Sequence, residues 1–123
     1  NLGVRYLIIG LYTVLERFEE CEKIYNKYSD DSTFMLFPLA VMYYKRGDYR
    51  KCKKILKEIQ ENNKYLLDYL IGIKKFTKAK TKDIEINGTY SWGSESEAYF
   101  VAKDYKYLLE TVPTFVEFIE REI

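Results

Sequence analysis

The sequence contains no histidine, and this absence excludes several kinds of active site. Ser-His and Cys-His nucleophile pairs, histidine metal sites and proton transfer through imidazole all require that side chain. The six glycines are scattered and make no phosphate-binding loop. Paired carboxylates such as Asp30 and Asp31 are more typical of solvated turns than of catalytic pairs. We therefore expect a protein that is not an enzyme and that uses no cofactor and no metal.

Cysteine is scarce, and long apolar runs are missing. Cys21 and Cys52 stand 31 residues apart without a CxxC pair, which indicates small buried residues rather than a disulfide or a zinc site. No run of about eighteen apolar residues occurs, so we expect no membrane-spanning helix and no membrane partner. The start carries no secretory signal, which favours a cytoplasmic protein. Because the chain begins without Met inside a predicted helix, we also expect further sequence upstream.

The chain does contain enough apolar residues for one folded domain. Its 123 residues are 47% hydrophobic and 32% charged, the composition of a soluble globular protein. Thirteen of them are tyrosine. Because tyrosine joins a large apolar ring to a polar hydroxyl, this excess suits both helix packing and hydrated contact surfaces. A biased source composition explains the excess equally well.

One pattern of aromatic, small, basic and apolar residues occurs twice at a constant offset. A fixed offset in this range is typical of stacked helical repeats, because one helix pair cannot bury its apolar face alone. The repeated pattern therefore predicts a helical scaffold and does not by itself predict a reaction. The first copy is Phe18, Cys21, Lys23, Ile24, Tyr25 and Tyr28, and the second is Tyr49, Cys52, Lys54, Ile55, Leu56 and Ile59.

Apolar residues at helical spacing, interrupted by short polar turns, predict helices along most of the chain. Gly47 suits the left-handed residue that closes a helix. Ser94 and Glu97 make a capping box that opens another helix. The predicted helices cover residues 2–16, 17–28, 33–46, 49–61, 64–78, 94–110 and 113–121.

A different pattern interrupts the helices after residue 78. Alternating Ile84 and Ile86 followed by Asn87 and Gly88 are typical of a short β-hairpin. An isolated hairpin of this size is marginally stable, so the sequence predicts either a small hairpin or a loop over 83–92.

The second predicted helix pair resembles one tetratricopeptide repeat. The resemblance rests on Leu36, Leu39, Ala40, Tyr43, Gly47, Tyr49, Cys52, Leu56 and Ile59, and the first pair matches at Tyr12, Phe18, Cys21, Tyr25 and Tyr28. It implies an all-α solenoid, a fragment of a right-handed superhelix. Residues 1–78 would hold the repeats 2–31 and 33–63 and a partial third repeat from 64.

The C-terminal block is similar to the tail of bacterial tetratricopeptide-like arrays. The similarity rests on Gly-Ser-Glu-x-Glu-Ala-Tyr over 93–99 and Pro-x-Phe-x-x-Phe-Ile over 113–119. It implies that 94–123 forms a helical cap, joined to the repeats by the loop or small hairpin of 79–93 within one structural domain. A short helical array needs such a cap because its last apolar face is otherwise exposed.

The tetratricopeptide resemblance also implies a binding face. In that family the first helix of each pair lines a concave groove, which would make this protein a non-catalytic scaffold or adaptor for a protein or peptide. Packing of Phe34, Phe37 and Val41 on neighbouring helices is an equally good interpretation of those positions. The groove residues implied are Tyr6, Thr13, Phe34, Phe37, Val41, Tyr44, Lys45, Lys75 and Lys78.

The net charge of +1 hides a basic middle and an acidic end. Residues 45–82 hold 13 basic and 4 acidic side chains, whereas residues 83–123 hold 3 and 9. Neighbouring helices of opposite charge explain this asymmetry, and the acidic tail would then lie against the basic middle. The alternative is a polyanion site formed by Arg50, Lys51, Lys54, Lys74, Lys75 and Lys78, although nucleic acid is disfavoured because no recognition motif is present. A homodimer, formed through the exposed first helix, is a third possibility.

Overall fold

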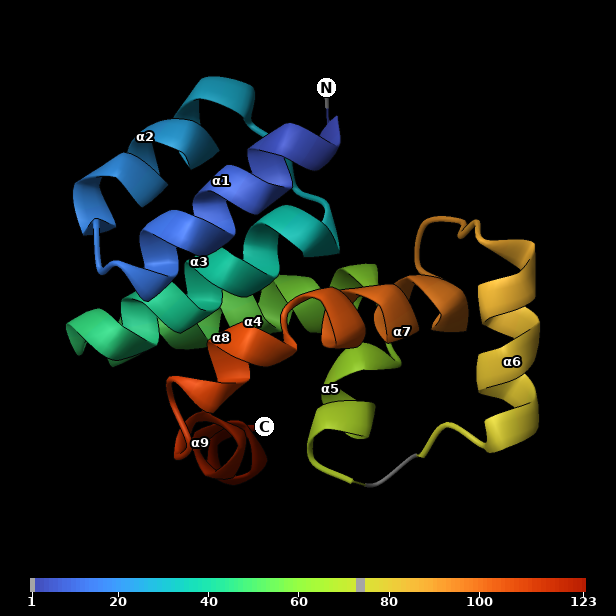
Figure 1. The fold of residues 1–123 in the computed structure, drawn as a ribbon. Coiled ribbons are helices and arrows are strands. Elements are labelled where there is room, and N and C mark those ends of the chain that lie inside the picture. The colour runs from blue at the N-terminus through green and yellow to red at the C-terminus, as the bar shows by residue number, and fades with distance from the viewer. Residues whose placement is uncertain (1, 73–74) are drawn as a thin grey trace.

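Two antiparallel helix pairs form the N-terminal half of the protein in this computed structural model, which describes residues 2–72 and 75–123 (Figure 1). The first pair is α1 (Leu2–Val14) and α2 (Phe18–Tyr28), and the second is α3 (Thr33–Arg46) and α4 (Tyr49–Asn62). Within the described ranges the chain forms helices and connecting segments but no strand. The prediction of an all-α protein is confirmed.

Local capping residues determine where the second pair begins and ends. The Ser32 side chain accepts a hydrogen bond from the Met35 N–H and opens α3, whereas Gly47 closes it with a left-handed φ of 82°. Asp48 then accepts a hydrogen bond from the Lys51 N–H and opens α4. Both helices therefore match their predicted ranges to within one residue.

Helix α3 is the centre of the core. Every residue from Thr33 to Tyr43 is buried, because α1, α2 and α4 pack on it together with the C-terminal helices. Its neighbours contribute mainly one apolar stripe each, such as Cys52, Ile55, Leu56 and Ile59 of α4. A helix that is apolar on all sides is stable only when it is covered on all sides.

The C-terminal block consists of three helices, α7 (Glu95–Asp104), α8 (Lys106–Glu110) and α9 (Phe115–Glu122). Ser94 opens α7 by accepting a hydrogen bond from the Glu97 N–H, as the capping box predicts. The single helix predicted over 94–110 is wrong, because the chain breaks at Tyr105. The Tyr105 hydroxyl donates to the backbone carbonyl of Phe34 at 2.7 Å and also lies 3.1 Å from the backbone carbonyl oxygen of Tyr6. These contacts hold the break against α3 and α1.

The segment between the two halves differs most from the prediction. The helix predicted over 64–78 is reduced to α5 (Leu66–Leu70), and residues 73–74 lie outside the described ranges. The hairpin or loop predicted over 83–92 is wrong for its first half, since α6 (Lys78–Asn87) runs through it. The Asn87-Gly88 pair ends a helix here, with Gly88 at φ 69° and its N–H donating to the Ile84 carbonyl.

Helix α6 stands at the edge of the molecule, apart from the two helix pairs (Figure 1). It buries no residue, and it is held through exposed contacts such as the ion pair between Lys80 and Glu95 at 3.2 Å. In the described ranges, no helix has both the length and the apolar character needed to cross a membrane.

Candidate functional site: an aromatic pocket beside helix α1

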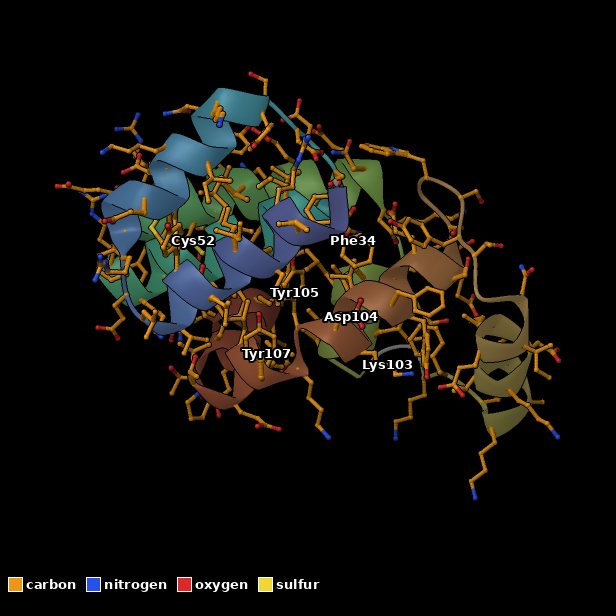
Figure 2. The ribbon with its side chains drawn as sticks, turned by 45° about the horizontal axis from the view of Figure 1, so that its top comes forward. Phe34, Cys52, Lys103, Asp104, Tyr105 and Tyr107 are labelled. Carbon is orange, nitrogen blue, oxygen red and sulfur yellow. The ribbon has the colours of Figure 1, made fainter. Side chains whose placement is uncertain are left out.

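An open pocket of about 470 Å³ lies where α1 meets the start of α3, the junction of α7 and α8, and the loop after α6. Figure 2 shows Phe34, Asp104, Tyr105 and Tyr107 gathered along α1, with Lys103 farther toward α6. Five aromatic rings dominate the lining, and Asp104 is the one charged residue among its described members. The pocket is lined by Gly3, Tyr6, Leu7, Phe34, Tyr90, Asp104, Tyr105 and Tyr107.

The polar turn before α3 holds one wall of the pocket. Tyr6 stacks on Phe34, with ring centroids 5.4 Å apart and planes inclined by 20°. Its hydroxyl donates to Asp30 Oδ2 at 2.8 Å and accepts from Ser32 Oγ at 2.9 Å. Burial raises the pKa of Tyr6 to about 12, and the hydrogen bond to the Asp30 carboxylate also raises it. Tyr6 is therefore a fixed, neutral ring rather than a titrating group.

The back wall is Tyr105, whose side chain is almost completely buried. Burial raises its pKa far above the ordinary value, so it stays neutral as a hydrogen-bond donor to the α3 backbone. Gly10 makes the neighbouring contact possible. A Cβ at that position would overlap the Tyr107 hydroxyl oxygen, so the Tyr107 side chain reaches the backbone of α1 because residue 10 has no side chain.

The mouth of the pocket is formed by Tyr90 and Asp104. Tyr90 lies in the loop after α6 and is 46% exposed, with its ring centroid 5.3 Å from that of Phe34. The Asp104 carboxylate has no hydrogen-bond or ion-pair partner among the described residues. Partial burial raises its pKa above the usual aspartate value, although the positive charge of Lys103 opposes this shift. Lys103 itself pairs with Glu85 of α6 at 3.3 Å.

Most of the predicted groove residues lie in the core rather than on a groove. Thr13, Phe37 and Val41 are completely buried and Phe34 nearly so. Phe37 packs against Tyr105 and Phe115, which belong to the C-terminal block. The chain's own tail therefore packs on α3 at Phe37, and the buried positions of this set contact neighbouring parts of the same chain.

The remaining groove residues have structural partners or lie elsewhere. The Tyr44 ring packs between Phe115 and Phe118, and its hydroxyl contacts that of Thr114. Lys45 is 8% exposed, donates to the Thr13 carbonyl at 3.3 Å and pairs with Glu16 at 3.7 Å. Lys75 and Lys78 are exposed near the start of α6, far along the chain from the buried set. Of the nine predicted residues, Tyr6 and Phe34 line the pocket.

The predicted polyanion residues do not form one surface within the described ranges. Arg50 and Lys54 are exposed on α4, whereas Lys51 pairs with Asp48 at 3.9 Å. Lys75 and Lys78 belong to the α6 region, and Lys74 lies outside the described residues. Two ion pairs connect the basic middle to the acidic end, Lys53 with Glu122 and Lys80 with Glu95, both at 3.2 Å.

The cysteines offer no reactive group. Cys21 and Cys52 are free and buried at equivalent positions of α2 and α4. Burial raises the pKa of the Cys52 thiol to about 12, so the nucleophilic thiolate is not populated at neutral pH. In the described parts of the chain no group of three or more His, Cys, Asp or Glu side chains is placed to hold a metal ion.

The sequence predicted two of the eight pocket residues, Tyr6 and Phe34. Gly3 and Leu7 of α1 were not singled out, and neither were the four residues that follow α6, Tyr90, Asp104, Tyr105 and Tyr107. Their separation from α1 along the chain is the reason, since Tyr105 and Tyr6 are 99 positions apart. The one signal in the sequence is the excess of tyrosine, which suits a hydrated contact surface but equally suits helix packing or a biased composition, and which gives no location.

Comparisons with known proteins do not supply a function. No protein-family model, no curated protein and no solved structure matches the chain.

Proposed function

We propose that this protein is a non-catalytic binding module, in which a scaffold of two tetratricopeptide-like helix pairs holds a pocket for a side chain of a peptide or protein partner. The observation that carries the proposal is the open aromatic pocket beside α1, with five rings held in place by packing and hydrogen bonds. Rigid aromatic rings around a concavity give large contact area at a low entropy cost, which is typical of peptide and protein binding sites.

The repeat equivalence supports the scaffold part of this proposal. Cys21 and Cys52 are both fully buried in the second helix of their pairs, at the offset that the repeated pattern requires. Small residues at these positions allow adjacent helices to approach closely. Free cysteines also suit a reducing compartment, so the proposed setting is the cytoplasm.

An exposed apolar stripe on α1 adjoins the pocket and supports a macromolecular partner rather than a small metabolite. Val4, Leu7 and Leu11 of α1 and Leu15 directly after it are between 48% and 66% exposed, and the spacing of three and four residues places the three helical ones on one side of α1. Leu7 also lines the pocket. A partner that fills the pocket would cover part of this stripe, and burial of apolar area would add to its affinity.

The proposal is tested by selecting binders from a random peptide library with the full chain and then measuring their affinities for two loop variants. Tyr90→Ala removes an exposed ring that lines the pocket, and we expect it to weaken binding by roughly tenfold or more, as truncation of an aromatic anchor does. Trp92→Ala is the matched control, because Trp92 is an exposed ring of the same loop that does not line the pocket. Equal affinity of the selected peptides for the wild type and Tyr90→Ala would reject the pocket as the binding site.

Polyanion binding and self-association are the two alternative functions, and the purified full chain can be tested for each. Arg50, Lys54 and Lys57 follow one outer side of α4 without an acidic partner among the described residues, and this favours a polyanion as the second candidate. Salt-dependent binding of a single-stranded oligonucleotide, lost on Lys54→Glu, would identify that function. Self-association through the α1 stripe would appear as a concentration-dependent mass in light scattering that Leu11→Lys abolishes.

A further inference from the structure

We propose that the pocket selects a cationic side chain, the ammonium of lysine or its methylated forms or the guanidinium of arginine, from a peptide partner. The inference rests on the proposed function and adds the class of side chain that the pocket takes. The occupant would lie against the exposed faces of the aromatic rings, with its charge toward the carboxylate of Asp104. Three observations support this assignment: the negative charge of Asp104, the attraction of aromatic ring faces for cations, and the hydrogen bonds that the tyrosine hydroxyls already donate within the protein.

The pocket carries a negative charge. Asp104 is the one charged residue among the described lining, and within residues 2–72 and 75–123 it forms no ion pair. Its neighbour Lys103 pairs instead with Glu85 on α6. Asp104 is also the last residue of α7, where the helix dipole disfavours a negative charge. Lys103 stabilises the Asp104 carboxylate only through its nearby charge and forms no ion pair with it, so the carboxylate is available to an external cation.

The rings around Asp104 provide the second favourable contact. The faces of tyrosine and phenylalanine rings carry partial negative charge and attract cations placed over them. Tyr90 is the exposed member of this set and packs on Phe34, whose other ring neighbours in the pocket are Tyr6 and Tyr105. The same protein already uses this contact on the other side of α1, where the Arg5 guanidinium lies 3.8 Å from the ring centroid of Tyr28.

The hydrogen-bond donors of the pocket explain why an anion is not the expected occupant. The Tyr6 hydroxyl donates to Asp30, and the Tyr105 hydroxyl donates to the Phe34 carbonyl. Two of the four tyrosine hydroxyls that line the pocket thus already donate hydrogen bonds to other groups of the protein. An acidic ligand would meet ring faces and the Asp104 carboxylate without these donors, and like charges at short range repel.

The volume of the pocket also fits a large cation. About 470 Å³ exceeds the space of a single butylammonium group and leaves room for a guanidinium or a trimethylated ammonium together with part of the flanking peptide. The exposed Leu7 at the rim offers an apolar surface for the methylene stem of such a side chain.

The test is an NMR titration of the ¹⁵N-labelled full chain with four acetylated and amidated peptides that differ only at the central residue, which is lysine, trimethyl-lysine, norleucine or glutamate. Norleucine has a similar length to lysine but carries no charge. We expect amide shifts at Leu7, Tyr90 and Tyr107, and about tenfold tighter binding of the lysine and trimethyl-lysine peptides than of the norleucine peptide. The glutamate peptide should leave these amides unchanged.

Two charge variants make the result specific to the pocket. Asp104→Asn should reduce the preference for lysine over norleucine by roughly three- to tenfold, because it removes the ion pair and keeps the rings. Asp83→Asn is the matched control, since Asp83 is an exposed residue of α6 outside the pocket, and it should leave the preference unchanged.

The outcomes separate this inference from the function on which it rests. Shifts at the pocket with norleucine or glutamate binding as tightly as lysine would overturn the cation preference and leave the binding function in place. A lysine preference that survives Asp104→Asn unchanged would overturn the role of Asp104. Absence of any shift at the pocket with all four peptides, together with library binders indifferent to Tyr90→Ala, would overturn both proposals.

Discussion

Single residues of the pocket differ in whether the fold needs them. Tyr6 and Tyr105 are held by hydrogen bonds to other parts of the protein, so each contributes to stability as well as to the pocket wall. Asp104 has no such partner among the described residues and stands at the unfavourable end of α7. A residue that costs stability and lines a pocket is a stronger candidate for function than one that the core requires.

The first prediction concerns the stability of Asp104→Asn. Partial burial raises the pKa of Asp104 in the folded state, so the folded protein binds more protons than the unfolded chain between the ordinary aspartate pKa, near 3.9, and the raised value. The contribution of this group to stability is therefore lost as the pH rises through that window. At pH 7 we expect Asp104→Asn to increase the free energy of unfolding, by less than about 1 kcal/mol because the side chain is largely exposed.

Urea denaturation of the wild type, Asp104→Asn and the control Asp83→Asn at neutral and strongly acidic pH checks this prediction. The higher free energy of unfolding of Asp104→Asn relative to the wild type should be present at pH 7. It should disappear in acid, where the wild-type carboxyl is protonated in both the folded and the unfolded state. A loss of stability at pH 7 would mean that the carboxylate has a structural role.

At the scale of elements, Gly10 of α1 contacts Tyr107 of α8, one of the residues that line the pocket. Gly10 in the middle of α1 lowers the intrinsic stability of that helix, by roughly 0.5–1 kcal/mol relative to alanine. The fold accepts this cost because the Tyr107 hydroxyl occupies the space of a Cβ. Helix propensity and tertiary packing therefore oppose each other at this position, and packing prevails.

The second prediction is a double-mutant cycle at this contact. Gly10→Ala should destabilise the wild type by about 1–3 kcal/mol, because overpacking forces Tyr107 out of place despite the gain in helix propensity. In a Tyr107→Phe background the hydroxyl is absent, and Gly10→Ala should cost clearly less, although the added Cβ still lies 3.2 Å from the Tyr105 ring. Thermal denaturation of the four proteins gives the coupling energy, and equal effects of Gly10→Ala in both backgrounds would contradict the contact.

At the scale of the whole molecule, one buried carboxylate joins the two N-terminal helix pairs to the C-terminal block. Glu97 of α7 is 1% exposed and accepts hydrogen bonds from Thr33 Oγ1 at 3.1 Å, Asn63 Nδ2 at 2.9 Å and the Gly93 N–H at 3.3 Å. These donors belong to the start of α3, the end of α4 and the loop before α7. The same network therefore holds the tail over the face of α3 that it covers.

The third prediction is that Glu97→Leu is among the most damaging substitutions in the protein. It removes the common acceptor of three donors and should cost roughly 3–5 kcal/mol of unfolding free energy, a large part of the total stability of a domain of this size. Glu97→Gln keeps one acceptor oxygen and should cost less. Urea midpoints measure both, and an unchanged midpoint for Glu97→Leu would show that the tail is held by apolar packing alone.

The all-α class and the helices of the second pair were predictable because their signals are local. Ser32, Gly47 and Asp48 act on backbone groups within a few residues, so their effect on helix ends depends little on the rest of the molecule. The same local reasoning failed at Asn87-Gly88, since a glycine with positive φ can close either a helix or a hairpin turn. The choice between the two depends on the neighbouring residues and their packing.

The sequence by itself determined the helical repeat pattern, the capping signals and the burial of Cys21 and Cys52. Only the tertiary structure decided that the C-terminal helices cover α3, that Phe37 and Val41 are therefore core residues, and that a pocket forms beside α1. The physical reason is the range of the interactions. Caps and periodicity act over a few positions, whereas the pocket depends on contacts such as that of Tyr105 with Tyr6, which the chain brings together only when it is folded.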